Sequence, residues 1–287
     1  MAFSVNTNTG AMAALQSLNS TNKGLEQVQS RINTGLKVAS TKDDSASYTI
    51  AQTLRGDQGG LQAVSSSLSR AKSVTDVAVA GAESISDIVN QMKQKAQQAS
   101  DGGIDTESRT AINKDFEALR DQIKTIVDSS SFNGTNLLKA SGGTVTALQS
   151  LTDTDSASGT YTPDSLSVDN LELDLGRSGG TFAKLTTTSK IDTAAAAKTM
   201  VNDLGDIAKN LNGKLSTLGA ASRKIDAQSA FTSKLSDVVE SGIGNLVDAD
   251  LAKESARLQA LQVKQQLGVQ ALSIANQAPQ SITSLFR

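Results

Sequence analysis

Apolar residues in the first forty positions recur in alternating steps of four and three. This spacing is the heptad repeat of a helix that packs along one seam against another helix. Two of its members, Asn22 and Gln29, are polar, and buried polar side chains in such a seam can fix its register. The predicted seam consists of Ala11, Leu15, Leu18, Asn22, Leu25, Gln29, Ile32 and Leu36.

The periodicity fails after Gly35 and resumes behind the pair Asp43-Asp44. A carboxylate just before a helix accepts hydrogen bonds from its free N–H groups and meets the positive end of its dipole. We therefore expect a break over residues 38–42, with Asp43 and Asp44 capping the next helix. Three glycines, at positions 56, 59 and 60, predict a weak or bent stretch after that.

The longest apolar ladder follows and predicts a helix roughly 60 Å long over residues 61–99. A second helix, over residues 112–126, ends before the turn sequence Phe132-Asn133-Gly134, and a third ladder covers residues 201–225. Short connections between long helices predict an antiparallel bundle. The first ladder contains Leu61, Val64, Leu68, Ala71, Thr75, Ala78, Ala82, Ile85, Val89, Met92, Ala96 and Ala99.

Residues 140–190 have a different composition, rich in Ser, Thr and Gly. Within them, Leu171, Leu173 and Leu175 alternate with acidic residues, which is the period-two pattern of a half-buried strand. We expect a small β insertion here.

The last segment, residues 245–287, follows an interruption at Gly242 and Gly244 and carries two apolar seams. A surface this wide exceeds what one partner helix covers, so one seam is expected to pair with the N-terminal helix and the other with a neighbouring subunit. One seam contains Leu251, Leu258, Leu261, Leu272 and Ala275, and the other contains Leu267, Ala271, Ile274 and Ala278.

These elements predict a mainly α fold: a long antiparallel helical bundle or coiled coil with paired N- and C-terminal helices and a small β insertion. The predicted domains are a terminal-helix coiled coil (1–40 and 245–287), a helical bundle (41–139 and 191–244) and a variable insertion (140–190). Terminal helices that need a partner suit head-to-tail assembly into a filament. A closed helical bundle is the alternative.

Composition narrows the function further. The chain has no Cys and no His, so thiol nucleophiles, the usual zinc ligands and a near-neutral proton shuttle are missing, and we expect neither enzyme activity nor a cofactor or metal. A net charge of −2 gives no reason to expect nucleic-acid binding. No stretch approaches the length of a membrane span, and the first ten residues lack the pattern of a cleaved signal peptide.

Three motifs resemble the bacterial flagellin family. Residues 32–46 (INTGLKVASTKDDSA) are similar to the family's N-terminal signature, residues 131–138 (SFNGTNLL) to its Phe-Asn-Gly turn, and residues 261–287 to its C-terminal ending. The resemblance covers residues 1–139 and 191–287 and leaves out the insertion.

The resemblance implies an exported structural subunit whose terminal helices form the inner tubes of an extracellular flagellar filament. Asp43 and Asp44 would lie at the base of a spoke that joins these helices to the bundle. Implied partners are further copies of the chain, an export chaperone on the C-terminal helix, and the junction and cap proteins of the flagellum. The implied filament-core residues are Leu15, Leu18, Asn22, Leu25, Gln29, Ile32, Leu36, Leu258, Leu261, Leu267, Ile274, Leu285 and Phe286.

One strip departs from part of the family. Flagellins sensed by the mammalian toll-like flagellin receptor carry Arg, Glu and Leu in the region matching Asn90 to Gln98. This chain instead has Gln91, Met92, Lys93, Gln94 and Lys95 at the centre of that strip. The resemblance therefore implies a weak agonist of that receptor.

Two alternatives share this architecture. A hook–filament junction protein has the same terminal helices and export route, although the Phe-Asn-Gly turn and the full C-terminal ending favour flagellin. An extracellular enzyme on a helical scaffold would need its catalytic groups in the insertion, and about fifty residues rich in Ser, Thr and Gly are small for one.

Overall fold

The computed structural model describes residues 7–153 and 162–285, with side chains described as far as Gln277. The order of elements is α1 (Thr9–Thr34), α2 (Ser45–Ala99), α3 (Thr106–Ser129), β1 (Val145–Asp153), β2 (Pro163–Val168), α4 (Ala194–Val247) and α5 (Leu251–Leu285). The predicted mainly α fold with a small β insertion is confirmed.

The chain divides into two compact units. Unit 1 consists of Met1–Gln58 and Val238–Arg287, and unit 2 consists of Gly59–Asp237. Helices α2 and α4 contribute residues to both. Unit 2 therefore holds the insertion together with most of the helical bundle.

Unit 2 is built on the long ladder of α2. All twelve predicted ladder residues, from Leu61 to Ala99, are buried. Thr75, the one polar member, satisfies its hydroxyl by donating to the carbonyl of Ala71 at 2.8 Å. Phe116 and Ile123 from α3 and Leu204 and Leu211 from α4 fill the same core.

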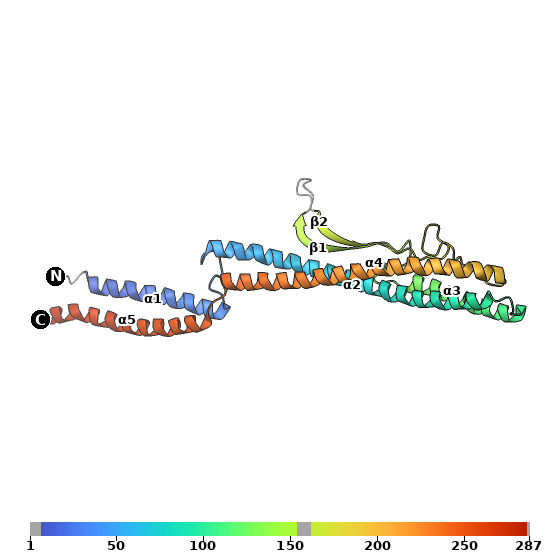
Figure 1. Cartoon of the computed structure of the whole chain (residues 1–287). Helices are drawn as coiled ribbons and strands as arrows, with labels where there is room; N and C mark the ends of the chain where they lie inside the picture. The colour runs from blue at the N-terminus through green and yellow to red at the C-terminus, as the bar shows by residue number, and fades with distance from the viewer. Residues whose placement is uncertain (1–6, 154–161, 286–287) are drawn as a thin grey trace. The chain divides into compact units, whose positions relative to one another are not determined.

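The three helices of unit 2 lie side by side (Figure 1). Lys95 of α2 pairs with Asp115 of α3 at 2.7 Å, which places the end of one helix beside the start of the next. Lys72 of α2 pairs with Asp226 of α4, and Lys93 lies beside Gly205. Residues with higher numbers on α2 contact residues with lower numbers on α4, so these two helices are antiparallel, as predicted.

The turn after α3 is a two-residue hairpin. The backbone N–H of Phe132 donates to the carbonyl of Thr135, and the N–H of Thr135 donates back. Asn133 and Gly134 both have left-handed backbones, with φ of 49° and 82°. Asn-Gly is the pair that this turn geometry favours, because both central residues need a positive φ.

The insertion holds one antiparallel pair of strands, β1 and β2, in which Val145 faces Val168 and Ala147 faces Leu166. All four side chains are buried, so one face of the hairpin joins the core of unit 2. The predicted strand at residues 171–175 is wrong. Leu171 and Leu173 are buried and donate their N–H groups to Leu137 and Leu138, but Glu172 between them has a φ of 52°, which interrupts an extended strand.

Two helix boundaries also differ from the prediction. Helix α2 runs unbroken through the glycines at 56, 59 and 60, and α4 continues past Gly242 and Gly244 to Val247. An isolated glycine costs a helix only about 1 kcal/mol relative to alanine, and packing elsewhere along a long helix outweighs that.

Candidate assembly surface

Helices α1 and α5 of unit 1 lie side by side and antiparallel (Figure 1). On each helix one stripe, spaced in steps of three and four, is buried or half-buried. This is the two-helix seam that the terminal periodicity predicted. On α1 it consists of Ala11, Ala14, Leu18, Thr21, Leu25, Val28 and Ile32, and on α5 of Glu254, Leu258, Leu261, Gln265, Gly268, Leu272 and Ala275.

The seam on α1 differs from the predicted one at every second position. Leu15 and Gln29 are exposed, and Ala14 and Val28 take their places. Small side chains on the buried line let the helices approach closely: a Cβ on Gly268 would lie 3.3 Å from Leu18 Cδ1. The remaining predicted residues of this helix, including Asn22, are half-buried.

On α5, Leu258 and Leu261 lie in the seam as predicted, whereas Leu251 is 49% exposed. The predictions for Leu285 and Phe286 fall outside the described side chains. Sequence reasoning missed Glu254, Gln265 and Gly268. Extending the four-three steps of the neighbouring leucines would have reached all three.

Polar contacts cross the seam at three levels. Asn8 Nδ2, just before the start of α1, donates to the carbonyl of Ala275 at 2.7 Å. In the middle, Gln265 Nε2 donates to Asn22 Oδ1 at 2.9 Å. At the other end, Arg31 forms an ion pair with Glu254 at 3.2 Å. Together they fix one antiparallel alignment.

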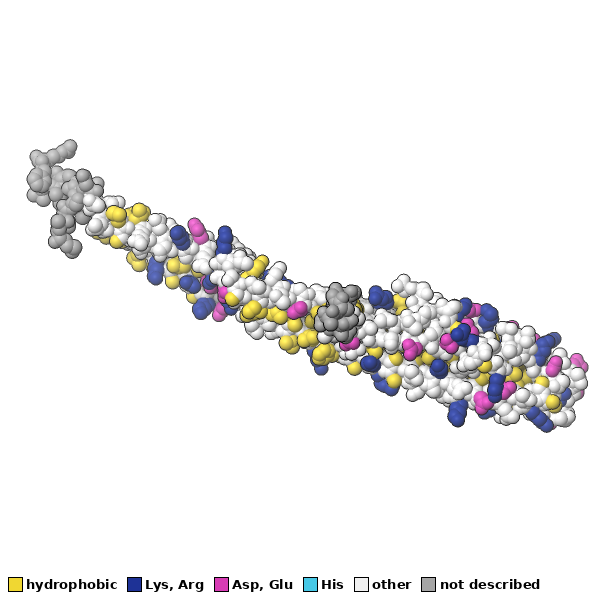
Figure 2. Space-filling view, turned by 90° about the horizontal axis from the view of Figure 1, so that it is seen from above, with side chains coloured by type: hydrophobic (Ala, Val, Ile, Leu, Met, Phe, Trp, Pro, Cys, Tyr) yellow, Lys and Arg dark blue, Asp and Glu magenta, His cyan; other side chains and the backbone are white. Residues whose placement is uncertain are grey.

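A second apolar surface on unit 1 is left uncovered. Nine of the twelve large hydrophobic side chains that are exposed among the described residues belong to this unit, and Figure 2 shows hydrophobic side chains at the surface of the terminal helices. Leu267 and Ile274 are 57% and 69% exposed and project from α5 on the side opposite its seam. The nine are Met12, Leu15, Ile50, Val238, Leu251, Val263, Leu267, Val269 and Ile274.

The loop after α1 is fixed to the end of α4. Gly35 ends α1 in the left-handed conformation, with φ of 72°, and its carbonyl accepts from the N–H of Ala249 at 2.8 Å. The N–H groups of Lys37 and Val38 both donate to the carbonyl of Val247. Val38 and Val247 are buried in a small core with Ala51 and Ile243.

The two adjacent carboxylates in this loop have separate roles. Asp44 caps α2 as predicted: its Oδ1 accepts from the N–H groups of Ala46 and Ser47, and its Oδ2 accepts from the Ser47 hydroxyl at 2.7 Å. These hydrogen bonds, first that from the Ser47 hydroxyl, lower the pKa of Asp44. Asp43 instead closes the preceding loop, accepting from Ala39 and from the N–H and hydroxyl of Ser40. The bonds from Ser40 lower the pKa of Asp43.

Comparison with known proteins identifies the family. Residues 5–142 match the bacterial flagellin N-terminal helical region, and residues 201–286 match the bacterial flagellin C-terminal helical region. The chain belongs to the bacterial flagellin family. Flagellins are structural subunits that polymerise into the flagellar filament, and they are not enzymes.

Full-length relatives agree with this identification. The chain is 46% identical to flagellin FljM of Caulobacter vibrioides, over 99% of the chain and 98% of the relative. It is 37% identical to a flagellin of Brucella melitensis, over 99% of each. A solved structure described as a flagellar hook-associated protein, from Vibrio parahaemolyticus, covers 72% of the chain with a TM-score of 0.54 and 16% identity, which shows a shared fold alone.

The strip compared with receptor-sensed flagellins lies on α2. Gln91 and Gln94 are exposed, while Lys93 and Lys95 are half-buried, and Lys95 is engaged with Asp115. Met92 is fully buried in the core of unit 2, as its place in the apolar ladder predicts, so it does not present its side chain on the surface of the strip.

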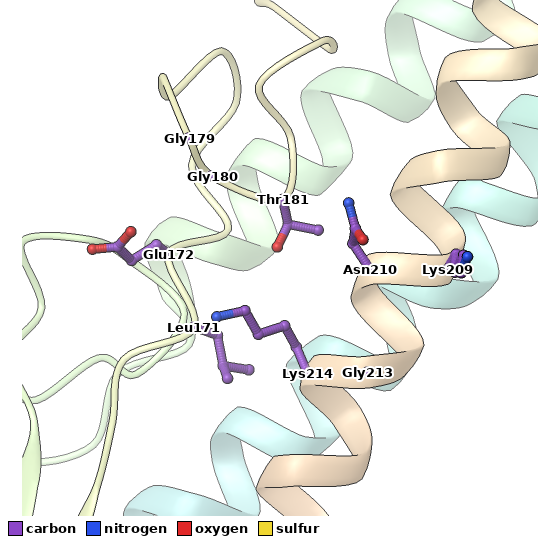
Figure 3. Close-up of a pocket in the computed structure, with 9 residues that line it drawn as sticks. All are labelled: Leu171, Glu172, Gly179, Gly180, Thr181, Lys209, Asn210, Gly213 and Lys214. Carbon is purple, nitrogen blue, oxygen red and sulfur yellow. The ribbon is translucent and has the colours of Figure 1, made fainter.

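The insertion and α4 enclose a hollow of about 400 Å³ in unit 2. In Figure 3 the side chains of Thr181, Asn210 and Lys214 face it, and the carboxylate of Glu172 points away from the Thr181 hydroxyl. The Glu172 carboxylate and the Thr181 hydroxyl therefore do not form a paired base and nucleophile. No cluster of three metal-binding side chains, and no helix long and apolar enough to cross a membrane, occurs in the part of the chain that the structure describes.

Proposed function

We propose that α1 and α5 build the filament core by using two opposite faces of α5. The seam with Leu258 and Leu261 is covered by α1 of the same chain, and the face with Leu267 and Ile274 is uncovered. Burying exposed apolar surface is the main driving force of association. The uncovered face, together with Met12 and Leu15 of α1, contacts neighbouring copies.

In this proposal residues 1–40 and 245–287 form the inner tubes, residues 41–139 and 191–244 the surrounding bundle, and residues 140–190 its variable outer part. Asp43 and Asp44 stabilise the spoke between tube and bundle. The tight fixation of Gly35 to Val38 on the end of α4 supports a spoke of defined geometry.

The proposal also includes the route to the filament. The chain is exported by the flagellar type III apparatus and becomes extracellular, with a chaperone covering the apolar surface of α5 before export. Junction and cap proteins then lie at the two ends of the polymer. The support is family membership together with the exposed apolar surface of α5, which needs cover before assembly.

Electron microscopy of purified chain, seeded with sheared filaments, tests this proposal. We expect filaments from the full chain and none from a version lacking residues 1–40 and 245–287. The double substitution Leu267→Gln/Ile274→Gln is expected to reduce polymer yield strongly, whereas Leu267→Ile, which keeps the exposed surface apolar, leaves it nearly unchanged. Filaments from the truncated chain would show that assembly does not need these helices.

We also propose that the chain is a weak agonist of the mammalian flagellin receptor, because Gln91 and Gln94 present uncharged amides on the exposed strip. Removing a charge-assisted pair from an interface costs about 1–3 kcal/mol. A cell reporter that responds to purified monomer as strongly as to an enteric flagellin would contradict this.

A further inference from the structure

Among the described residues of unit 1, Arg31 and Glu254 form the one ion pair, and it crosses the seam between α1 and α5. The side chains are 22% and 10% exposed, and the joined atoms, Arg31 NH1 and Glu254 Oε1, lie 3.2 Å apart. The remaining atoms are poorly satisfied: Arg31 Nε and Glu254 Oε2 are buried and have no hydrogen-bond partner. A buried pair with unmet hydrogen bonds contributes little net stability, since desolvation offsets the attraction between the charges.

The position of this ion pair indicates a role in aligning the two helices more than in stabilising them. Arg31 lies in the last turn of α1 and Glu254 in the first turn of α5, so each charge has the sign that the dipole of its own helix favours. The pair also lies where the seam meets the loop fixed to Val247. A shift of α5 by one heptad along α1 would break this ion pair and place another residue opposite the buried Glu254.

Much of the rest of the seam consists of Leu and Ala, whose heptad spacing recurs after a shift of seven residues. The close packing of Gly268 against Leu18 favours the observed alignment sterically but supplies no charged partner. Among the side chains that the structure describes, Asn22–Gln265 is the second specific side-chain pair across the seam, and a neutral hydrogen bond is less costly to lose than a buried ion pair.

We propose that Arg31 and Glu254 are positioning residues that set the alignment of α1 with α5 of the same chain. A chain then enters the polymer with its uncovered apolar faces in one fixed arrangement. This inference rests on the proposed role of the terminal helices in assembly.

Seeded polymerisation of charge-exchanged full chains tests it. Arg31→Glu alone and Glu254→Arg alone are expected to raise the critical concentration at least about tenfold, because each places like charges together in a buried seam. The double exchange Arg31→Glu/Glu254→Arg is expected to recover to within about threefold of the parent. The recovery is incomplete because the exchanged charges oppose both helix dipoles. Arg257→Glu, at an exposed position on α5, is the control and should behave like the parent.

Mixing the parent with the double exchange separates pairing within a chain from pairing between chains. If the pair forms within one chain, the two proteins copolymerise on either seed. A double exchange that grows only on its own seeds would place the pair between chains, and one no better than the single exchanges would overturn the proposal.

An apolar replacement separates alignment from stability. Arg31→Met/Glu254→Leu is expected to keep the thermal unfolding of the parent but to polymerise poorly, because the seam loses its alignment signal. Unchanged polymerisation of this variant would overturn the proposal. Failure of the parent itself to grow on seeds would instead contradict the assembly role of the helices.

Discussion

At the scale of single residues, polar side chains that bind backbone groups determine where elements begin and end. Asn136 is the clearest case, because it is buried and forms hydrogen bonds through both the nitrogen and the oxygen of its amide. Its Nδ2 donates to the carbonyl of Val127 at 2.7 Å, and its Oδ1 accepts from the N–H groups of Leu138 and Lys139. It therefore joins the end of α3 to the start of the insertion.

Asn136→Ala should lower the free energy of unfolding by about 2–3 kcal/mol, because it leaves one carbonyl and two N–H groups without that partner in a buried place. Asn202→Ala, at an exposed position on α4, should change stability by less than about 0.5 kcal/mol. Chemical denaturation of both variants measures the difference. Equal effects would show that the buried amide has no special structural role.

Asp44 gives a prediction about pH. Its pKa in the folded chain lies below the ordinary value of 3.8, so its cap stabilises the fold above that value and is lost as the pH falls through the lowered folded pKa. Asp44→Ala should therefore lower the melting temperature at pH 7 and have little effect in strong acid. Asp57→Ala removes an exposed carboxylate from the interior of the same helix and is the control for the effect on the melting temperature at pH 7. A penalty for Asp44→Ala that does not shrink in acid would contradict the capping role.

At the scale of elements, the sequence was sufficient to predict a helix and its buried face where the apolar residues of a periodic pattern all pack into one core. The ladder from Leu61 to Ala99 could be predicted completely, because every member faces one core. The sequence alone could not exclude a strand at residues 171–175, because leucines and acidic residues do alternate there. What interrupts the strand is the positive φ of Glu172. The seam of α1 was predicted at four of its seven positions. Leu15 and Gln29 have the same spacing as the buried residues, and spacing alone does not show how closely two helices approach.

Two glycines of α2 should respond oppositely to alanine. A Cβ on Gly81 would lie 2.5 Å from Ser130 Oγ and 2.7 Å from Leu138 Cδ1, whereas nothing lies within 4 Å of a Cβ on Gly56. We expect Gly81→Ala to destabilise the chain by about 1–3 kcal/mol through overpacking. Gly56→Ala should stabilise it by about 0.5–1 kcal/mol through helix propensity. Thermal unfolding compares them, and a gain from both would mean that α2 and the turn after α3 are not in close contact.

At the scale of the whole molecule, exposed apolar side chains are concentrated in unit 1, while unit 2 has a continuous buried core. This contrast supports the proposal that the subunit polymerises through the apolar faces of unit 1. The sequence predicted that the C-terminal helix has more apolar surface than one partner covers. It could not show which seam meets α1, because Leu258 and Leu267 are equally apolar and only packing distinguishes them.

The most direct test of the central claim locks the seam within one chain. The chain has no Cys, and a Cβ on Gly268 would lie 3.8 Å from Leu18 Cβ, within the range of a disulfide. We would oxidise Leu18→Cys/Gly268→Cys, add seeds, and examine the product by electron microscopy and non-reducing electrophoresis. The account predicts filaments whose cross-links all lie within single chains. Filaments that form only after reduction, or cross-links that join different chains, would contradict it.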